Sequence, residues 1–213
     1  SHTLRNKQLN ETYHSIHGAV QESMHVFIRH GLQYFHQTYQ PTNISILEIG
    51  FGTGLNAFLA LRYGRESSID IRYTTLEPFP LPKDVWSALN YAADGRSGFD
   101  LIHEAPSNRE EELSPGFSIL KMKTLLQEVA LSAKYDVIFF DAFAPSVQPE
   151  LWMFDCLKKV VDTMAVNGVF VTYSAKGQLK RDLKALGLTV ETLAGPPGKM
   201  EMVRGLAGRT KSE

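Results

Sequence analysis

The sequence predicts an α/β fold built on a mostly parallel seven-stranded sheet that ends in an antiparallel C-terminal strand. From Ser45 onward, short apolar runs alternate with amphipathic stretches, the pattern of parallel strands covered by helices on both faces. The last two apolar runs flank the turn Gly195-Pro-Pro-Gly198, so they are close enough to pair antiparallel. The 213 residues suffice for a single domain (1–213), with an N-terminal helical segment (1–44) and an inserted excursion (94–116).

Each element follows from its local pattern. Strands are apolar runs bounded by turn residues, whereas helices repeat apolar positions every three or four residues. One expected helix carries Pro149 near its start, where proline is tolerated, and Gly187 ends the next. We expect strands over residues 45–49, 70–76, 117–122, 135–141, 169–173, 188–193 and 200–206, with a short strand over 100–103 inside the excursion. We expect helices over residues 24–35, 56–62, 83–93, 125–133, 149–164 and 178–186.

Three glycines, Gly50, Gly52 and Gly54, connect the first of these strands to a helix. Because glycine lacks a Cβ, the turn can adopt positive φ and let a ligand lie against the backbone. The following helix directs its N-terminal amides to the same place. A dinucleotide fingerprint has its third glycine one position later, where this chain has Leu55. The shorter spacing resembles motif I of S-adenosylmethionine-dependent methyltransferases, although such turns also occur without a ligand.

Two carboxylates come at the ends of predicted strands, where open α/β sheets bind their ligands. Glu77 ends the second strand, and a carboxylate there can accept hydrogen bonds from both hydroxyls of a ribose. Asp141 ends the fourth strand, where it can accept a proton from an attacking amine or orient that amine. Without a ligand, Glu77 would be a surface glutamate before a turn, and Asp141 would belong to a capped turn before a helix.

The residues after Asp141 resemble the acidic-Pro-Pro-aromatic signature of amine methyltransferases. Phe143 can support a flat ring that bears the amine. Pro145 and Pro149 are rigid and can fix the position of the carboxylate relative to that amine. Many methyltransferases also carry an acid just past the third strand, which contacts the adenine. Here that region contains Thr124 and no acid, so Thr124 or the backbone would serve.

Four segments together are similar to one family, the methyltransferase domain of the tRNA 5-methylaminomethyl-2-thiouridine biosynthesis bifunctional enzyme. They are LEIGFGTGLN, LEPFPL, FFDAFAPSVQPELW and GPPGKMEM. The resemblance implies a Rossmann-like methyltransferase fold and transfer of a methyl group from S-adenosylmethionine to the 5-aminomethyl group of (2-thio)uridine at the tRNA wobble position. It implies cofactor contacts from Gly50, Phe51, Gly52, Gly54, Asn56, Glu77, Pro78 and Asp141, with Asp141 also catalytic and with substrate contacts from Phe143, Pro145 and Lys199.

The resemblance also implies partners. Some family members carry a flavin-dependent oxidase that prepares the same nucleoside, but this sequence has no second glycine-rich fingerprint. We therefore expect a stand-alone form without flavin, with tRNA as substrate; the oxidase step would then belong to a separate oxidase or be unnecessary. No apolar run approaches the roughly 20 residues of a membrane span and no signal peptide is present, so we expect a cytoplasmic protein with no membrane contact.

The charge distribution, the single cysteine and the histidines give further expectations about binding sites and disulfides. The net charge is −1, but basic residues gather in the C-terminal third, either to attract phosphates or as a solvated face. The lone Cys156 excludes an internal disulfide and lies in an apolar stretch, which indicates a buried, inert thiol. His14 and His17 have no companion ligands at metal spacing, so we expect no metal. The basic residues are Lys176, Lys180, Arg181, Lys184, Lys199, Arg204, Arg209 and Lys211.

Other functions remain open. An aminopropyltransferase or a small-amine N-methyltransferase shares the fold and the acid after the fourth strand, but a site for polycations should hold several acids around Asp141. A non-catalytic nucleotide- or RNA-binding module is a second alternative. A nicotinamide dehydrogenase is disfavoured by the glycine spacing.

Overall fold

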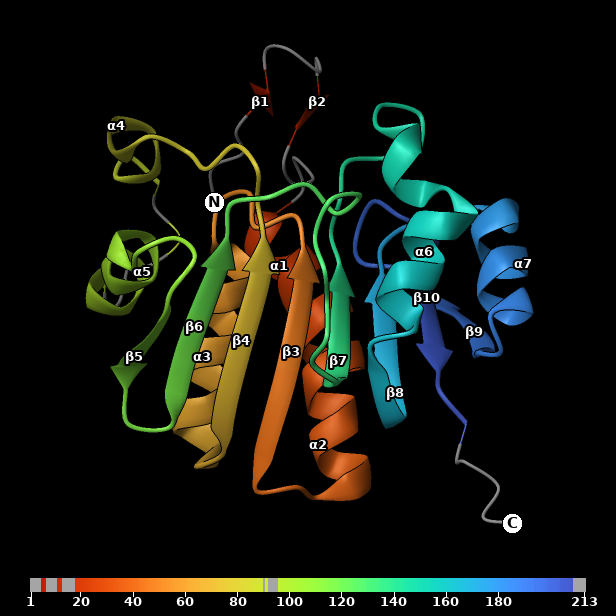
Figure 1. The fold of residues 1–213 in the computed structure, drawn as a ribbon, viewed down its shortest axis with the longest axis horizontal. Coiled ribbons are helices and arrows are strands. Elements are labelled where there is room, and N and C mark those ends of the chain that lie inside the picture. The colour runs from red at the N-terminus through yellow and green to blue at the C-terminus, as the bar shows by residue number, and fades with distance from the viewer. Residues whose placement is uncertain (1–4, 7–10, 13–17, 90, 92–95, 209–213) are drawn as a thin grey trace.

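The computed structural model describes residues 5–6, 11–12, 18–89, 91 and 96–208. Its centre is an eight-stranded sheet with the order β5-β6-β4-β3-β7-β8-β10-β9, and a separate two-stranded sheet joins β1 to β2 (Figure 1). The five strands from β6 to β8 run parallel, whereas β5, β10 and β9 pair antiparallel. The strands are β1 (Arg5–Asn6), β2 (Glu11–Thr12), β3 (Asn43–Ile49), β4 (Asp70–Leu76), β5 (Glu110–Ser114), β6 (Phe117–Met122), β7 (Tyr135–Phe140), β8 (Met164–Thr172), β9 (Thr189–Ala194) and β10 (Glu201–Leu206).

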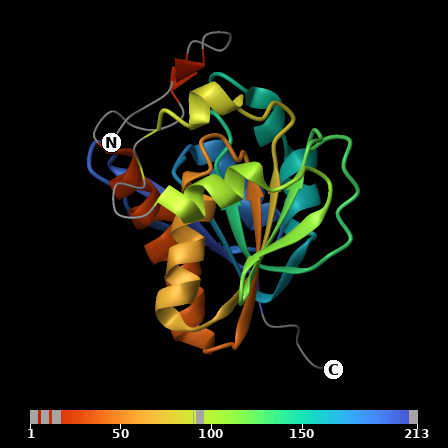
Figure 2. The ribbon, with the colours of Figure 1, turned by 90° about the vertical axis from the view of Figure 1, so that its left-hand side faces the viewer.

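Helices cover both faces of the large sheet, as the alternation of strands and helices predicts. Figure 2, which views the sheet from its side, shows α3 on one face and α6 on the other. In β7 the side chains alternate: Val137 and Phe139 belong to the core under α3 and η1, whereas Ile138 and Phe140 belong to the core under α6 and α7. The helices are α1 (Ala19–Ser23), η1 (Met24–Gln33), α2 (Tyr34–Tyr39), α3 (Leu55–Ser67), α4 (Lys83–Trp86), α5 (Arg96–Glu104), η2 (Pro149–Trp152), α6 (Phe154–Val161) and α7 (Gly177–Ala185).

The predicted fold class is confirmed, with one strand more than expected. The seven predicted strands are all present, and the hairpin of β9 and β10 is antiparallel. The eighth strand, β5, lies in the segment predicted as an excursion and pairs antiparallel with β6. The acidic sequence of β5 lacks the apolar run that predicts a strand, because β5 is an edge strand whose charges remain in solvent.

Three predictions of local structure are wrong. The strand expected over residues 100–103 is part of helix α5, because Phe99 and Ile102 lie three residues apart on one buried face. The helix expected over residues 125–133 stops after one turn, and the Lys159 ammonium donates hydrogen bonds to the carbonyls of Leu126, Gln127 and Val129. The helix expected over residues 149–164 is two pieces, η2 and α6, and its last residue begins β8.

The helix predicted over residues 24–35 is present, but η1 is wound as a π-helix between α1 and α2. Gly31 lies at its closest approach to the sheet: a Cβ there would lie 2.8 Å from Val171 Cγ2 and 3.1 Å from Phe139 Cε1. Glycine at this position therefore lets the helix backbone pack directly on β7 and β8. The helix predicted over residues 83–93 is shorter, with α4 ending at Trp86.

Some expectations concern parts of the chain outside this description. His14 and His17 lie outside the described residues, as do Arg209 and Lys211. No helix among the described residues is long and apolar enough to cross a bilayer. Cys156 is buried, and its burial raises the pKa of the thiol, as expected for an inert cysteine.

Candidate active site

The carboxyl ends of three neighbouring strands bring the predicted site residues together. Gly50 follows β3, Glu77 follows β4 and Asp141 follows β7. The ladders continue one residue beyond the strands, because Gly50 N donates to Leu76 O at 3.1 Å and Asp141 N donates to Ile49 O at 2.9 Å. Residues far apart in sequence thus lie side by side at the upper edge of the sheet in Figure 1.

The glycine turn has the backbone that its sequence predicts. Gly50, Gly52 and Gly54 have φ of 93°, 51° and 74°. A Cβ on Gly50 would lie 2.6 Å from the backbone oxygen of Asp141, and a Cβ on Gly54 would lie 2.8 Å from His103 Nε2. Gly54 is the N-cap of α3 and supplies no side-chain cap. The turn is therefore a bare-backbone cradle at the start of a helix, where side chains would intrude.

Glu77 is oriented by the same turn. Its Oε2 accepts the N–H of Gly52 at 3.1 Å, and its Oε1 accepts the N–H of Phe79 at 3.0 Å. Burial raises the pKa of Glu77, while these two hydrogen bonds oppose the rise. A carboxylate has about four acceptor positions, so two remain after the backbone bonds. These two match the pair of hydroxyls on a ribose.

Asp141 belongs to a buried polar network. Asn56 Nδ2 donates to Asp141 Oδ2 at 2.8 Å and to Glu48 Oε1 at 3.1 Å. Glu48 Oε2 accepts from Thr75 Oγ1 at 2.7 Å. One amide thus bridges two carboxyl groups from neighbouring strands, and Asn56 Oδ1 is buried with no hydrogen-bond partner within the described residues.

Both carboxyl groups have a raised affinity for protons. Desolvation, the largest cause, raises the pKa of Glu48 from 4.5 to about 8. Desolvation also raises the pKa of Asp141 well above its usual value, followed in effect by the charges of Glu48 and Glu22. The hydrogen bond from Asn56 and the charge of Lys199 oppose this shift. Asp141 is therefore a far better proton acceptor than an aspartate in water.

Aromatic residues fix the backbone that follows Asp141. Trp152 Nε1 donates to Phe143 O at 2.8 Å, and the Tyr173 hydroxyl donates to Ala142 O at 2.6 Å. The rings of Trp152 and Tyr173 meet edge to face, with centroids 6.2 Å apart. Phe143 and Pro145 are half-buried, and the two hydrogen bonds hold the carbonyls of Ala142 and Phe143 in place.

Lys199 reaches this region from the turn between β9 and β10. Its ammonium is hydrogen-bonded to Glu22 on α1 and lies 3.9 Å from the centre of the Tyr173 ring. The structure thus adds an aromatic ring and a second acid to the neighbourhood of Asp141. Sequence reasoning missed Tyr173 and did not place Glu22 beside Asp141. Their signal is weak, because they lie on elements distant from the glycine turn.

The other predicted residues differ in placement. Phe51 is buried in the core, where its ring is 5.3 Å from that of His103, and its Cζ would lie 2.9 Å from a Cβ on Gly54. Pro78 is half-buried beside Glu77. Thr124 is half-buried just past β6, and the neighbouring Lys123 N–H donates to Asn108 Oδ1 at 2.9 Å. Glu48 was missed too, although a single acid within the apolar run of β3 is a readable signal.

Among the described residues, no group of three or more His, Cys, Asp or Glu side chains could hold a metal ion. The donor set instead suits S-adenosylmethionine. The glycine cradle excludes side chains, Glu77 offers two acceptor positions, and the buried Asn56 Oδ1 provides an acceptor for an ammonium group. The residues present therefore fit the cofactor.

Comparisons with known proteins point to the same cofactor. Residues 107–207 match a family model described as S-adenosyl-L-methionine-dependent methyltransferase. A protein named tRNA 5-methylaminomethyl-2-thiouridine biosynthesis bifunctional protein MnmC, from Methylobacillus flagellatus, is 31% identical over 216 residues, which are 92% of this chain and 32% of that protein. The protein of the same name from Leptospira borgpetersenii is 27% identical over 97% of this chain and 34% of its own length. The chain thus spans about a third of the length of these curated relatives.

Solved structures give the same result. The crystal structure of MnmC2 from Aquifex aeolicus has a TM-score of 0.78 and 25% identity, and the match covers 99% of this chain and 69% of that one. The N-methyltransferase NodS from Bradyrhizobium japonicum has a TM-score of 0.51, 13% identity and coverage of 85% of this chain and 96% of its own. The second likeness shows the fold alone.

Proposed function

Because the chain belongs to the S-adenosyl-L-methionine-dependent methyltransferases, we propose that it methylates the 5-aminomethyl group of (2-thio)uridine at the wobble position of tRNA. Two kinds of observation support this substrate. The relatives that match nearly the whole chain are named for biosynthesis of 5-methylaminomethyl-2-thiouridine in tRNA. The observation that carries the proposal is the position of Asp141, a proton acceptor held by Asn56 beside the glycine cradle.

The residues that would hold the cofactor come from the strand ends. The backbone of Gly50, Gly52 and Gly54 would lie against its methionine end, and Glu77 would accept its ribose hydroxyls. Asn56 Oδ1 is the acceptor that we assign to the cofactor's amino group. When bound, S-adenosylmethionine supplies an electrophilic sulfonium methyl group.

Asp141 controls the protonation of the incoming amine. An alkyl ammonium has no lone pair for attack, and an ordinary aspartate is too weak a base to remove its proton. The raised pKa of Asp141 brings the carboxylate closer to the amine in proton affinity. Because Asn56 holds Oδ2, we assign the incoming proton to Oδ1. The nitrogen gains one methyl group and gives one proton to the carboxylate or to solvent.

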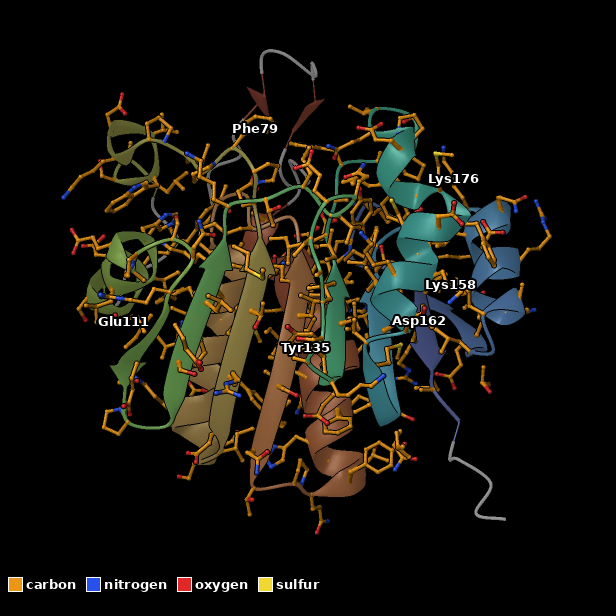
Figure 3. The ribbon with its side chains drawn as sticks, in the orientation of Figure 1. Phe79, Glu111, Tyr135, Lys158, Asp162 and Lys176 are labelled. Carbon is orange, nitrogen blue, oxygen red and sulfur yellow. The ribbon has the colours of Figure 1, made fainter. Side chains whose placement is uncertain are left out.

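The remaining predicted residues would contact the nucleoside. Phe143 and Pro145 follow Asp141 on a segment that Trp152 holds by a backbone hydrogen bond, so they can support the uracil ring. Lys176 is exposed at the start of α7 and appears in Figure 3 near the same end of the sheet as Phe79. Together with the basic side chains of α7, it would attract the phosphates of the RNA.

The proposal takes residues 1–213 as one methyltransferase domain, because β3 to β10 hydrogen-bond into one sheet. The curated relatives are bifunctional by name. From the family resemblance we propose that an oxidase acts on the same nucleoside, supplied by another protein or by a further part of this one.

A small-amine N-methyltransferase is the second candidate, and one observation favours it. The sequence indicated few acids around Asp141, but the structure places Glu22 and Glu48 close enough to raise its pKa. An acid-rich neighbourhood suits a cationic small amine as well as a nucleoside amine. Aromatic and proline residues on the substrate side favour the nucleoside.

One experiment separates the two candidates. The protein is incubated with methyl-labelled S-adenosylmethionine and either tRNA that carries 5-aminomethyl-2-thiouridine or a small diamine such as putrescine. We expect label in a single nucleoside after digestion of the tRNA, with the mass of the 5-methylaminomethyl product. Label in the diamine and none in the tRNA would refute the proposal and support the second candidate.

A further inference from the structure

The ammonium of Lys199 lies in a small site with features of a receptor for amines. On one side it is hydrogen-bonded to the Glu22 carboxylate, whose side chain is 8% exposed. On another side it lies 3.9 Å from the centre of the Tyr173 ring. A carboxylate and an aromatic face are the two groups that proteins combine to bind alkylammonium ions.

Each wall of this site is held in place independently of Lys199. Tyr173 donates its hydroxyl hydrogen to Ala142 O at 2.6 Å, which ties the ring to the segment that carries Asp141. Glu22 lies in α1, immediately before the long π-helix η1 that packs on the sheet. Both walls would therefore persist if the lysine side chain left.

Lys199 itself is on a surface turn. Two backbone hydrogen bonds close the turn, from Gly195 N to Met200 O at 3.0 Å and from Lys199 N to Pro196 O at 2.9 Å. His25 Nε2 donates to Ala194 O at 2.9 Å, so a second contact docks the turn on η1. The Lys199 side chain is 33% exposed, and a flexible four-carbon chain joins its ammonium to the turn. The ammonium can thus leave the site without unfolding of the turn.

The site borders the proposed reaction centre. Glu22 and Lys199 both act on the proton affinity of Asp141 through their charges, in opposite directions. Tyr173 and Asp141 are also joined through Ala142, the residue that accepts the tyrosine hydrogen bond and follows Asp141. An ammonium bound to Glu22 and Tyr173 therefore lies against the segment that carries the Asp141 carboxylate.

We propose that Glu22 and Tyr173 form a binding subsite for the alkylammonium group of the substrate, and that Lys199 occupies this subsite until the substrate displaces it. The link to the substrate amine rests on the proposed function, whereas the subsite itself does not. Neutral ligands cannot compete with a resident cation, so the lysine selects for amines. Once displaced, the Lys199 ammonium is available for a phosphate of the RNA, which reconciles its inward position with the predicted substrate contact.

Binding of ethylammonium tests the subsite without cofactor or RNA. Saturation-transfer NMR measures its affinity for the wild type and for K199M, which keeps the length of the side chain but removes the charge. We expect K199M to bind ethylammonium at least about 5-fold more tightly than the wild type, because the competitor is gone. Ethanol, the neutral analogue, should bind to neither protein. K180M is the matched control, because it removes an ammonium that pairs with Glu201 at 3.0 Å outside the subsite.

A second substitution identifies the walls. Adding Glu22→Gln to K199M should weaken ethylammonium binding about 10-fold, because the neutral amide keeps the shape but loses the charge. Circular dichroism shows whether this double variant is folded, and K199M with Tyr173→Leu, which removes the aromatic ring, replaces it if it is not. Equal affinity in wild type and K199M, or no loss on removal of Glu22 or Tyr173, would overturn the proposal. Since no methyl transfer is measured, these results are independent of the outcome with tRNA.

Discussion

The side-chain amide of Asn56 donates a hydrogen bond to the Asp141 carboxylate at 2.8 Å, although 85 positions separate the two residues in sequence. The same amide nitrogen donates to Glu48, so its two hydrogens are both used. Asp141 is thus oriented by an amide that a second, buried carboxyl group holds in place. The proposed proton acceptor depends on three strands of the sheet and the first turn of α3 together.

Replacing Asp141 with Asn should reduce turnover by about 10²-fold or more and change cofactor affinity little. The asparagine can still accept the hydrogen bond from Asn56, but it cannot accept a proton from the amine. Steady-state methyl transfer and calorimetry with S-adenosylmethionine measure the two effects separately. Asp155→Asn, an exposed change on α6, is the control. Turnover equal to that of the control would remove Asp141 from the chemistry.

Replacing Glu77 with Ala should weaken cofactor binding by roughly 10- to 100-fold, because charged hydrogen bonds contribute about 1.5–3 kcal/mol. Turnover at saturating cofactor should stay within a few-fold of the wild type, since Glu77 does not touch the reacting atoms. Calorimetry gives the affinity, with Glu112→Ala on the edge strand β5 as a matched exposed control. Unchanged affinity would refute the ribose assignment.

Replacing Gly50 with Ala should destabilise the protein by about 1–3 kcal/mol, since its φ of 93° is strained for alanine. The new Cβ would also lie 2.6 Å from Asp141 O and push the two strand ends apart. Urea unfolding measures the change in the free energy of unfolding. Gly208→Ala is the matched control, because a Cβ there meets nothing within 4 Å and φ is not positive. The idea fails if both variants are equally stable.

Glu48 should make the stability of the protein depend on pH. Its pKa is raised from 4.5 to about 8 in the folded protein, so the folded state keeps a proton that the unfolded chain releases. Between these values the free energy of unfolding falls as pH rises, by up to about 1.4 kcal/mol per pH unit. The E48Q variant cannot titrate there and should lack this contribution.

The measurement is urea unfolding of the wild type and E48Q from pH 5 to pH 9. We expect E48Q to gain stability relative to the wild type up to about pH 8 and the difference to level off above it. The contributions of other titrating groups to the free energy of unfolding are the same in both proteins and cancel, unless those groups contact Glu48. A difference that is constant across the range would show that Glu48 ionises at its ordinary pKa.

The basic side chains of α7 should contribute to RNA binding. Lys176 and Lys184 are exposed, whereas Lys180 already pairs with Glu201. Replacing Lys176 and Lys184 with Ala should weaken tRNA binding and reduce the slope of log affinity against log salt by about 1 per lost phosphate contact. Fluorescence anisotropy at several salt concentrations gives the slope. Lys158→Ala on α6, which removes a partner of Asp162, is the control. A slope unchanged from the wild type would exclude α7 from the RNA contact.

The sequence predicted which residues gather at the candidate site where the signal is local, and it missed those whose contacts are remote. The spacing of Gly50, Gly52 and Gly54 dictates a positive-φ turn, and Glu77 and Asp141 end strands whose apolar runs are plain. No local pattern could indicate that Glu22 would meet Lys199, because folding brings them together across 177 positions.

The wrong local predictions have the same origin. Residues 125–133 have helical composition, but Lys159 donates hydrogen bonds to carbonyls that a longer helix would have used internally. The edge strand β5 is too acidic to be read as a strand, and pairing with β6 decides its structure. In both cases a tertiary partner outweighs the intrinsic preference of the segment.

The π-helical winding of η1 has a consequence for how the length of this segment can vary. Successive residues of a helix are rotated about its axis, so a deletion or insertion between Met24 and Gly31 would rotate everything upstream around that axis. With Gly31 fixed against the sheet, the carboxylate of Glu22 would then swing out of alignment with Tyr173. Homologues that retain the subsite of Glu22 and Tyr173 should therefore conserve the number of residues between Glu22 and Gly31 more strictly than the identities of those residues.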